Sequence, residues 1–213
     1  MALPRALAAA LAAASLALAA PAAAAPAAAD YAAGVAALAA GDFDTALGAF
    51  RPLAEAGMAD AQNDLGVLYG GGFGVPRDDA AAAAWFRRAA EQGHARGATN
   101  LARLYLHGLG VPQDAAQAAR WYKEAALTGY APAQGQLGQL YYKGQGVPQD
   151  IVRAYFWWSL AAQRGDHEST VARESAAYMM TPHQIRVGNI LAEHWQPDWV
   201  RRRADAGIAW PAP

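Results

Sequence analysis

The stretch Leu65-Gly66-Val67-Leu68-Tyr69-Gly70-Gly71-Gly72-Phe73-Gly74-Val75-Pro76-Arg77-Asp78 returns twice, with substitutions, at a constant interval of 36 residues. The later copies span 101–114 and 137–150. A tryptophan keeps the same step at Trp85, Trp121 and Trp157. A period of about 20 to 50 residues is typical of a solenoid, in which each unit buries its apolar face against its neighbours. The sequence therefore predicts a stacked array of repeats.

Each 36-residue unit is predicted to hold two helices. The first runs from about 59 to 70, where Leu65 and Leu68 recur at helical spacing. The Gly-x-Gly-Val-Pro segment ends it, because glycine accepts positive φ and the residue before proline avoids the α region. Asp78 is the expected N-cap of the second helix, which ends at Gly93.

The size of the repeated residues predicts how the helices pack. Gly66, Ala102 and Gly138 are expected to face small alanines of the Ala89 and Ala125 type, so that the helix axes approach closely. The repeated tryptophans are expected to fill the remaining gaps between helices.

The segments on either side extend the array. Upstream, residues 31–57 predict a helix pair with a tight turn, because the spacing of Gly34 and Ala46 is four residues shorter than the equivalent spacing in a full unit. Downstream, residues 166–178 predict one helix. A second begins at the capping box of Thr181-Pro182-His183-Gln184. An array needs such atypical end helices to cover its last apolar face.

These repeated residues closely resemble the Sel-one-like repeat, a relative of the tetratricopeptide repeat. The resemblance covers three copies, at 58–93, 94–129 and 130–165. It implies an all-α fold, a right-handed α-solenoid of helix-turn-helix repeats, and an adaptor or regulatory role in protein–protein interaction. The predicted organisation is completed by a tetratricopeptide-like pair at 30–57, C-terminal capping helices at 166–197 and a tail at 198–213.

The first 29 residues have the composition of a cleaved secretory signal. Arg5 precedes an apolar run at 6–20, and the small residues of 21–29 suit a signal peptidase. The run is short for a membrane span, which needs about 20 apolar residues. We expect cleavage between Ala23 and Ala29, a periplasmic or secreted protein, and no stable membrane insertion after cleavage. An uncleaved N-terminal anchor is the alternative.

The charge balance argues against a nucleic-acid partner. Without Arg5 the chain carries 16 basic and 18 acidic residues, a net charge of −2, which provides no basic field. Arg201-Arg202-Arg203 is a short basic run that fits a solvated helix terminus or, alternatively, a contact with an acidic partner. The chain has no cysteine, so packing alone holds the domain together, and we expect a monomer.

No pattern in the sequence predicts catalysis, a metal or a cofactor. The glycines at 70–74 lack the Gly-Lys-Ser/Thr of a phosphate loop, the histidines lack metal-site spacing, and no serine lies in a Gly-x-Ser-x-Gly elbow. Asp166-His167-Glu168 concentrates polar side chains where a helix should begin, which N-terminal capping explains at least as well as acid–base chemistry does. The family resemblance leaves an alternative, an envelope enzyme or binder of β-lactam or peptidoglycan-related ligands. The relatives with such ligands are cysteine-rich, unlike this chain.

Candidate binding residues come from comparing the repeats with one another. The positions that vary within each first helix follow steps of 3, 4, 3 and 1, and so share one side of that helix. By resemblance to tetratricopeptide proteins, this is the concave side. We predict a groove for a protein or peptide partner with acidic side chains or a free carboxylate, the alternative being a merely solvated face. The predicted groove residues are Asn63, Arg96, Thr99, Asn100, Arg103, His107, Gln139, Tyr142 and Lys143.

Overall fold

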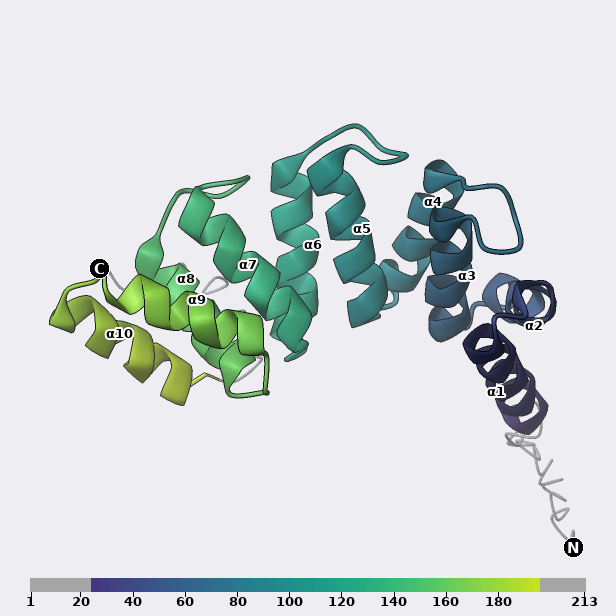
Figure 1. The fold of residues 1–213 in the computed structure, drawn as a ribbon, viewed down its shortest axis with the longest axis horizontal. Coiled ribbons are helices and arrows are strands. Elements are labelled where there is room, and N and C mark those ends of the chain that lie inside the picture. The colour runs from purple at the N-terminus through teal and green to yellow at the C-terminus, as the bar shows by residue number, and fades with distance from the viewer. Residues whose placement is uncertain (1–23, 196–213) are drawn as a thin grey trace, which may run out of the picture.

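The computed structural model describes residues 24–195, and all regular structure within this range is α-helical. Successive helix pairs follow one another along an arch with α1 at one end and α10 at the other (Figure 1). This confirms the predicted all-α solenoid of helical repeats. The helices are α1 (Ala24–Ala40), α2 (Phe43–Glu55), α3 (Ala59–Gly71), α4 (Asp79–Glu91), α5 (Ala95–His107), α6 (Ala115–Leu127), α7 (Ala131–Lys143), α8 (Ile151–Ala162), α9 (His167–Ala177) and α10 (Pro182–Glu193).

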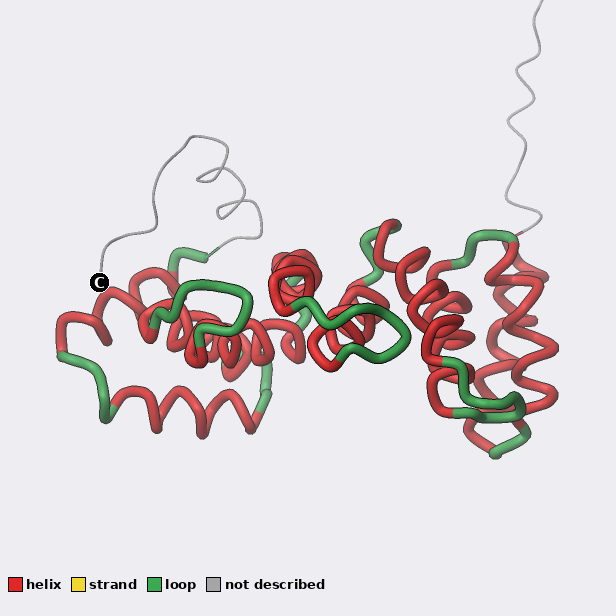
Figure 2. Tube along the Cα trace, turned by 90° about the horizontal axis from the view of Figure 1, so that it is seen from above, coloured by secondary structure: helices red, strands yellow, loops and turns green. Residues whose placement is uncertain are grey.

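A loop of the same design separates the two helices of each repeat (Figure 2). In the first repeat, Gly72 ends α3 in the left-handed region, with φ of 68°. Asp78 then caps α4 by accepting hydrogen bonds from the amides of Ala80 and Ala81, at 3.0 and 2.9 Å. The same glycine and aspartate positions end and begin the helices of the other two repeats, at Gly108, Asp114, Gly144 and Asp150. The predicted stop and start signals are thus confirmed.

The second glycine of each loop packs closely against the preceding helix pair. Gly110 lies against the backbone at Asp79, where α4 begins, and Gly146 lies against the backbone at Ala115, where α6 begins. Both glycines have positive φ, and a Cβ at either position would overlap the neighbouring backbone. The constant Gly-x-Gly spacing therefore serves helix termination and the contact between repeats at once.

Gly66 and Gly138 face aromatic rings, so the predicted contact of these two glycines with small alanines was wrong. A Cβ on Gly66 would lie 2.7 Å from the ring of Phe86, and a Cβ on Gly138 would lie 2.7 Å from that of Trp158. Ala89 instead faces Gly97, whose added Cβ would lie 2.7 Å from it. A ring occupies more volume than a methyl group, which explains why the facing helix carries no side chain there.

The repeated tryptophans are not equivalent, which corrects the prediction that all three fill gaps in the core. Trp157 is 2% exposed, whereas Trp85 and Trp121 are only partly buried against the core. The residue after each tryptophan is also aromatic, and it is buried in every repeat. These residues are Phe86, Tyr122 and Trp158.

Both ends of the array differ from the repeats. Helices α1 and α2 are joined by the short turn Gly41-Asp42, and α1 begins at Ala24, upstream of the predicted start at 30. At the other end, α9 and α10 both pack against α8. Thr181 and Gln184 form the capping box of α10. Most of the predicted signal, the tail and the run of arginines lie outside the described residues.

Candidate binding cleft

A cleft of about 520 Å³ lies between α5, α7 and α9. Tyr122 of α6 and Trp158 of α8 contribute aromatic surface to it, and both are almost fully buried. The first helices of successive units form its walls, because they occupy the same side of the solenoid. The lining residues are Thr99, Asn100, Arg103, Leu106, His107, Tyr122, Pro132, Gly135, Gln136, Gln139, Trp158, Asp166, Glu168, Ser169 and Ala172.

One wall carries positive charge. Arg103 and His107 lie one helical turn apart on α5, are exposed, and form no ion pair or hydrogen bond through their side chains with any other described residue. Burial raises the pKa of Tyr122 to about 12, and the nearby Arg103 opposes this shift only in part. At physiological pH, Tyr122 is therefore neutral, and the Arg103 guanidinium beside it has no hydrogen-bond or ion-pair partner among the described residues.

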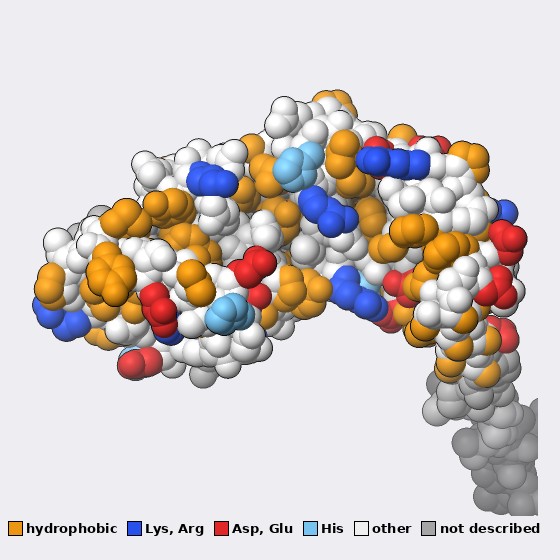
Figure 3. Space-filling model, in the orientation of Figure 1, with side chains coloured by type: hydrophobic (Ala, Val, Ile, Leu, Met, Phe, Trp, Pro, Cys, Tyr) orange, Lys and Arg blue, Asp and Glu red, His pale blue; other side chains and the backbone are white. Residues whose placement is uncertain are grey.

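The opposite wall carries negative charge from the start of α9. Asp166 caps this helix by accepting a hydrogen bond from the amide of Ser169 at 2.9 Å. Glu168 is exposed and has no side-chain partner in the part of the chain that the structure describes. The predicted capping role is confirmed for Asp166. The sequence alone did not indicate that Asp166 and Glu168 line the cleft. Continuing the 36-residue step would have found Glu168, which occupies the repeat position of Arg96 and Pro132. Lys/Arg and His side chains gather over the middle of the molecule, with Asp and Glu side chains beside them toward the C-terminal helices (Figure 3).

The cleft brings together five of the nine predicted groove residues: Thr99, Asn100, Arg103, His107 and Gln139. Tyr142 lies outside it, where its hydroxyl approaches Met179 Sδ at 3.9 Å and its ring packs on Trp158. Lys143 is exposed but does not line the cleft. Arg96 and Asn63 belong instead to a polar network between α1, α3 and α5.

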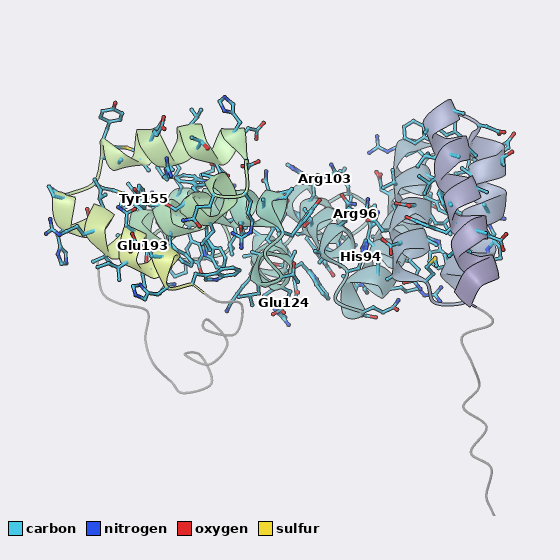
Figure 4. The ribbon with its side chains drawn as sticks, turned by 90° about the horizontal axis from the view of Figure 1, so that it is seen from below. His94, Arg96, Arg103, Glu124, Tyr155 and Glu193 are labelled. Atoms are coloured by element: carbon cyan, nitrogen blue, oxygen red, sulfur yellow. The ribbon has the colours of Figure 1, made fainter. Side chains whose placement is uncertain are left out.

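The outer part of this network joins equivalent positions of adjacent repeats. Asp60 Oδ1 lies 3.2 Å from Arg96 Nη2 and 3.1 Å from His94 Nε2. Because His94 Nδ1 accepts the amide hydrogen of Gly97, its Nε2 is the protonated nitrogen and donates to Asp60. His94, Arg96 and Arg103 follow one another at and along α5 (Figure 4). Among the described residues, Arg96 is thus paired, whereas Arg103 is not.

The inner part of the network is centred on Asp64, which is 9% exposed. Its carboxylate accepts hydrogen bonds from the Tyr31 hydroxyl at 2.7 Å and from Asn63 Nδ2 at 2.9 Å. Asn63 Oδ1 accepts a further bond from Asn100 Nδ2 at 3.0 Å. Burial, together with the hydrogen bond to Asp64, raises the pKa of Tyr31 well above its ordinary value. Asn63 is therefore a buried residue that bridges Asp64 and Asn100.

A second, smaller recess of about 290 Å³ lies on the other side of Arg103. It opens where α3 has Gly70 and Gly71, at positions that carry larger side chains in the later repeats. Phe73 and Leu109 contribute apolar surface to it. Arg103 lines both recesses and so stands between a polar cleft and a largely apolar one.

Among residues 24–195, no group of three or more His, Cys, Asp or Glu side chains could hold a metal ion. Within the same range, every helix is too short or too polar to cross a bilayer.

The Sel1 repeat model matches the chain in three consecutive segments, 59–94, 95–130 and 131–166. These segments make up half of the sequence, and the chain therefore belongs to the Sel1 repeat family. This confirms the family resemblance inferred from the repeated residues. Sel1 repeat proteins are generally protein-interaction modules that act as non-catalytic scaffolds.

Two solved structures resemble the chain over most of its length. The crystal structure of a Sel1 repeat protein from Oxalobacter formigenes is 29% identical, with a TM-score of 0.64 over 67% of this chain. That of c5321, a protective antigen present in uropathogenic Escherichia coli strains and displaying an SLR fold, is 32% identical, with a TM-score of 0.66 over 80% of this chain. The present chain spans 59% and 37% of those two chains, respectively. Comparison with curated proteins gives no significant match.

Proposed function

We propose that this protein is a non-enzymatic adaptor or regulator of the bacterial cell envelope that binds a peptide segment of a partner protein in the central cleft. The observation that carries the proposal is the pair Arg103 and His107, which face a recess with aromatic surface and have no side-chain partner among the described residues. Charges that a fold does not neutralise internally are available to a ligand, and an aromatic surface adds apolar contact.

The amide side chains of the cleft support a peptide rather than a compact ligand. Asn100, Gln136 and Gln139 come from two successive first helices and line the cleft between its charged walls. Amide groups both donate and accept hydrogen bonds, which suits the alternating N–H and C=O groups of an extended backbone. The size of the cleft lies within the usual range for ligand sites, about 300–1,000 Å³.

The proposed location depends on the composition of residues 1–29. Intact-mass measurement of the protein from the envelope fraction should show a first residue between Ala24 and Tyr31. Full-length protein retained in the cytosol would contradict the envelope assignment and leave the binding proposal standing.

The binding proposal is tested by crosslinking and pull-down from the native envelope, with mass spectrometry of the captured proteins. Arg103→Glu should reduce capture of the principal partner at least tenfold, about 1.4 kcal/mol, with unchanged helix content and melting temperature. The matched control is Lys143→Glu, an exposed reversal on the same side of the solenoid that does not line the cleft. A second control, Arg120→Glu/Lys123→Glu, reverses two charges on α6 at positions that do not line the cleft.

Normal capture by Arg103→Glu, with loss in either control, would assign the interaction to another surface. Hydrolysis of nitrocefin or of muropeptides by the purified chain would contradict the non-enzymatic part of the proposal.

A further inference from the structure

The cleft has walls of opposite charge, and this difference restricts what can bind there. Arg103 and His107 face it from α5, while Asp166 and Glu168 face it from the start of α9. We propose that the cleft recognises a peptide segment presenting an acidic and a basic side chain together, the acidic one toward α5 and the basic one toward α9. This inference rests on the proposed function, because it specifies the peptide that the cleft would bind.

Segments of a single charge sign fit this arrangement poorly. A purely acidic segment long enough to cross the cleft would gain contacts with Arg103 but would place like charge beside Glu168. A purely basic segment would gain contacts with Glu168 but would place like charge beside Arg103. Like charges brought together at an interface weaken binding, so the two walls disfavour both kinds of segment. A segment with one group of each sign forms favourable contacts at both walls.

The charges of the cleft remain available because the fold pairs them neither with each other nor with neighbours. Arg103, His107 and Glu168 have no side-chain hydrogen bond or ion pair within residues 24–195. Asp166 uses one carboxylate oxygen, Oδ2, in capping α9. By contrast, Arg96 and Asp60 satisfy each other one repeat away. On the same side of the solenoid, the charges of Asp60 and Arg96 therefore pair within the fold, whereas those of Arg103 and Glu168 have no partner among the described residues.

The aromatic residues place the peptide between the walls without specifying charge. Trp158 donates its indole N–H to the carbonyl of Gly135 at 3.2 Å, so its donor is used within the fold, and its 3% exposure leaves only an edge of the ring at the cleft. Tyr122 stays neutral, as its raised pKa indicates. An apolar or aromatic ligand residue between the two charged ones would complete the contact.

The test uses the purified protein on a peptide array whose central positions vary among Glu, Lys, Tyr and Ser. The retained peptides should carry both Glu and Lys, in one preferred order. Arg103→Glu should remove the preference for Glu, and Glu168→Lys the preference for Lys. Each variant should weaken the best peptide at least tenfold in fluorescence anisotropy. Asp166 is left unchanged because of its role as the N-cap of α9.

Exchange of the two charges provides a sharper readout than loss of binding. The Arg103→Glu/Glu168→Lys double variant should bind the best peptide resynthesised with its Glu and Lys exchanged, and bind it better than the original. A matched control, Gln139→Trp, should block all array peptides by filling the cleft.

The outcomes separate this inference from the proposed function. Retained peptides that are uniformly acidic, uniformly basic or uncharged, and are still blocked by Gln139→Trp, would overturn the inference alone. Retention of no peptide, or of peptides insensitive to Gln139→Trp, would overturn both. If the double variant binds the original peptide as well as it binds the charge-exchanged peptide, the two-wall arrangement is also rejected.

Discussion

The solenoid has two polar regions on the same side, one around α3 and the start of α5 and the other between α5 and α9, and they use their charges differently. In the first, Asp60 pairs with Arg96, and Asp64 binds Tyr31 and Asn63. In the second, Arg103 and Glu168 have no side-chain partner in the described part of the chain. We call these the closed network and the open cleft.

The difference shows that repeat position alone does not give a residue its role. Arg96 and Glu168 occupy the same position in different units, yet one is held by an acidic neighbour and the other lines an open recess. Charges that satisfy each other stabilise the array, whereas charges without partners are available for recognition. The comparison therefore predicts stability effects in the closed network and binding effects in the open cleft.

The largest expected effect should be the same in both regions. Phe86 and Trp158 occupy the same repeat position, and each is buried against a glycine. Gly66, which Phe86 faces, lies on α3 with Asp60 and Asp64, and Gly138, which Trp158 faces, lies on α7 beside the cleft residue Gln139. Replacing either with alanine should cost about 3–5 kcal/mol, because each leaves a cavity. Urea unfolding followed by circular dichroism measures this. A large loss at one ring and less than about 1 kcal/mol at the other would mean that the regions differ in their cores as well.

Asp64→Ala should separate the two regions. It leaves Tyr31 and Asn63 without a common acceptor in a buried setting, and should cost about 1.5–3 kcal/mol. Arg103→Ala should change the free energy of unfolding by less than about 0.5 kcal/mol, because the side chain is exposed and unpaired within the described residues. The same urea titration measures both. Similar losses for the two variants would break the distinction between closed and open regions.

Alkaline pH should weaken the closed network through Tyr31. The pKa of this hydroxyl is raised in the folded protein above its ordinary value of 10.0, so folding favours the protonated form. Its contribution is fully present below about pH 10 and is lost as the pH rises further. Tyr31→Phe should be about 1 kcal/mol less stable than wild type at neutral pH. That difference should shrink above pH 10. A constant difference across the alkaline range would argue against the Tyr31–Asp64 bond.

The smallest effect is expected at the exposed ion pair. Asp60 and Arg96 are each about half exposed, with side-chain exposures of 51% and 49%, so water and salt weaken their attraction. Arg96→Ala should cost about 0–1 kcal/mol and leave partner capture unchanged. Loss of capture in this variant, with Arg103→Glu unaffected, would place the binding surface over the closed network instead.

The repeating residues predicted most of the local structure correctly. Gly72, Asp78 and the Thr181 capping box act where the sequence placed them, because caps and turns depend on residues only a few positions away. The partners of Gly66 and the burial of Trp121 were predicted incorrectly. These depend on how two helices rotate against each other, and a residue pattern within one helix does not specify that rotation.

The sequence by itself determined the 36-residue repeat, the helix boundaries within the repeats and the side of each first helix on which Arg103 and Gln139 lie, since helical periodicity relates positions within one element. Only the tertiary structure decided that Asp60 lies beside Arg96 while Glu168 faces a cleft with Arg103. The physical reason is that two side chains form an ion pair only when their charged groups lie within a few ångströms of each other. Pairing therefore depends on the stacking of successive repeats, which brings α3 close to the start of α5 and leaves a recess between α5 and α9.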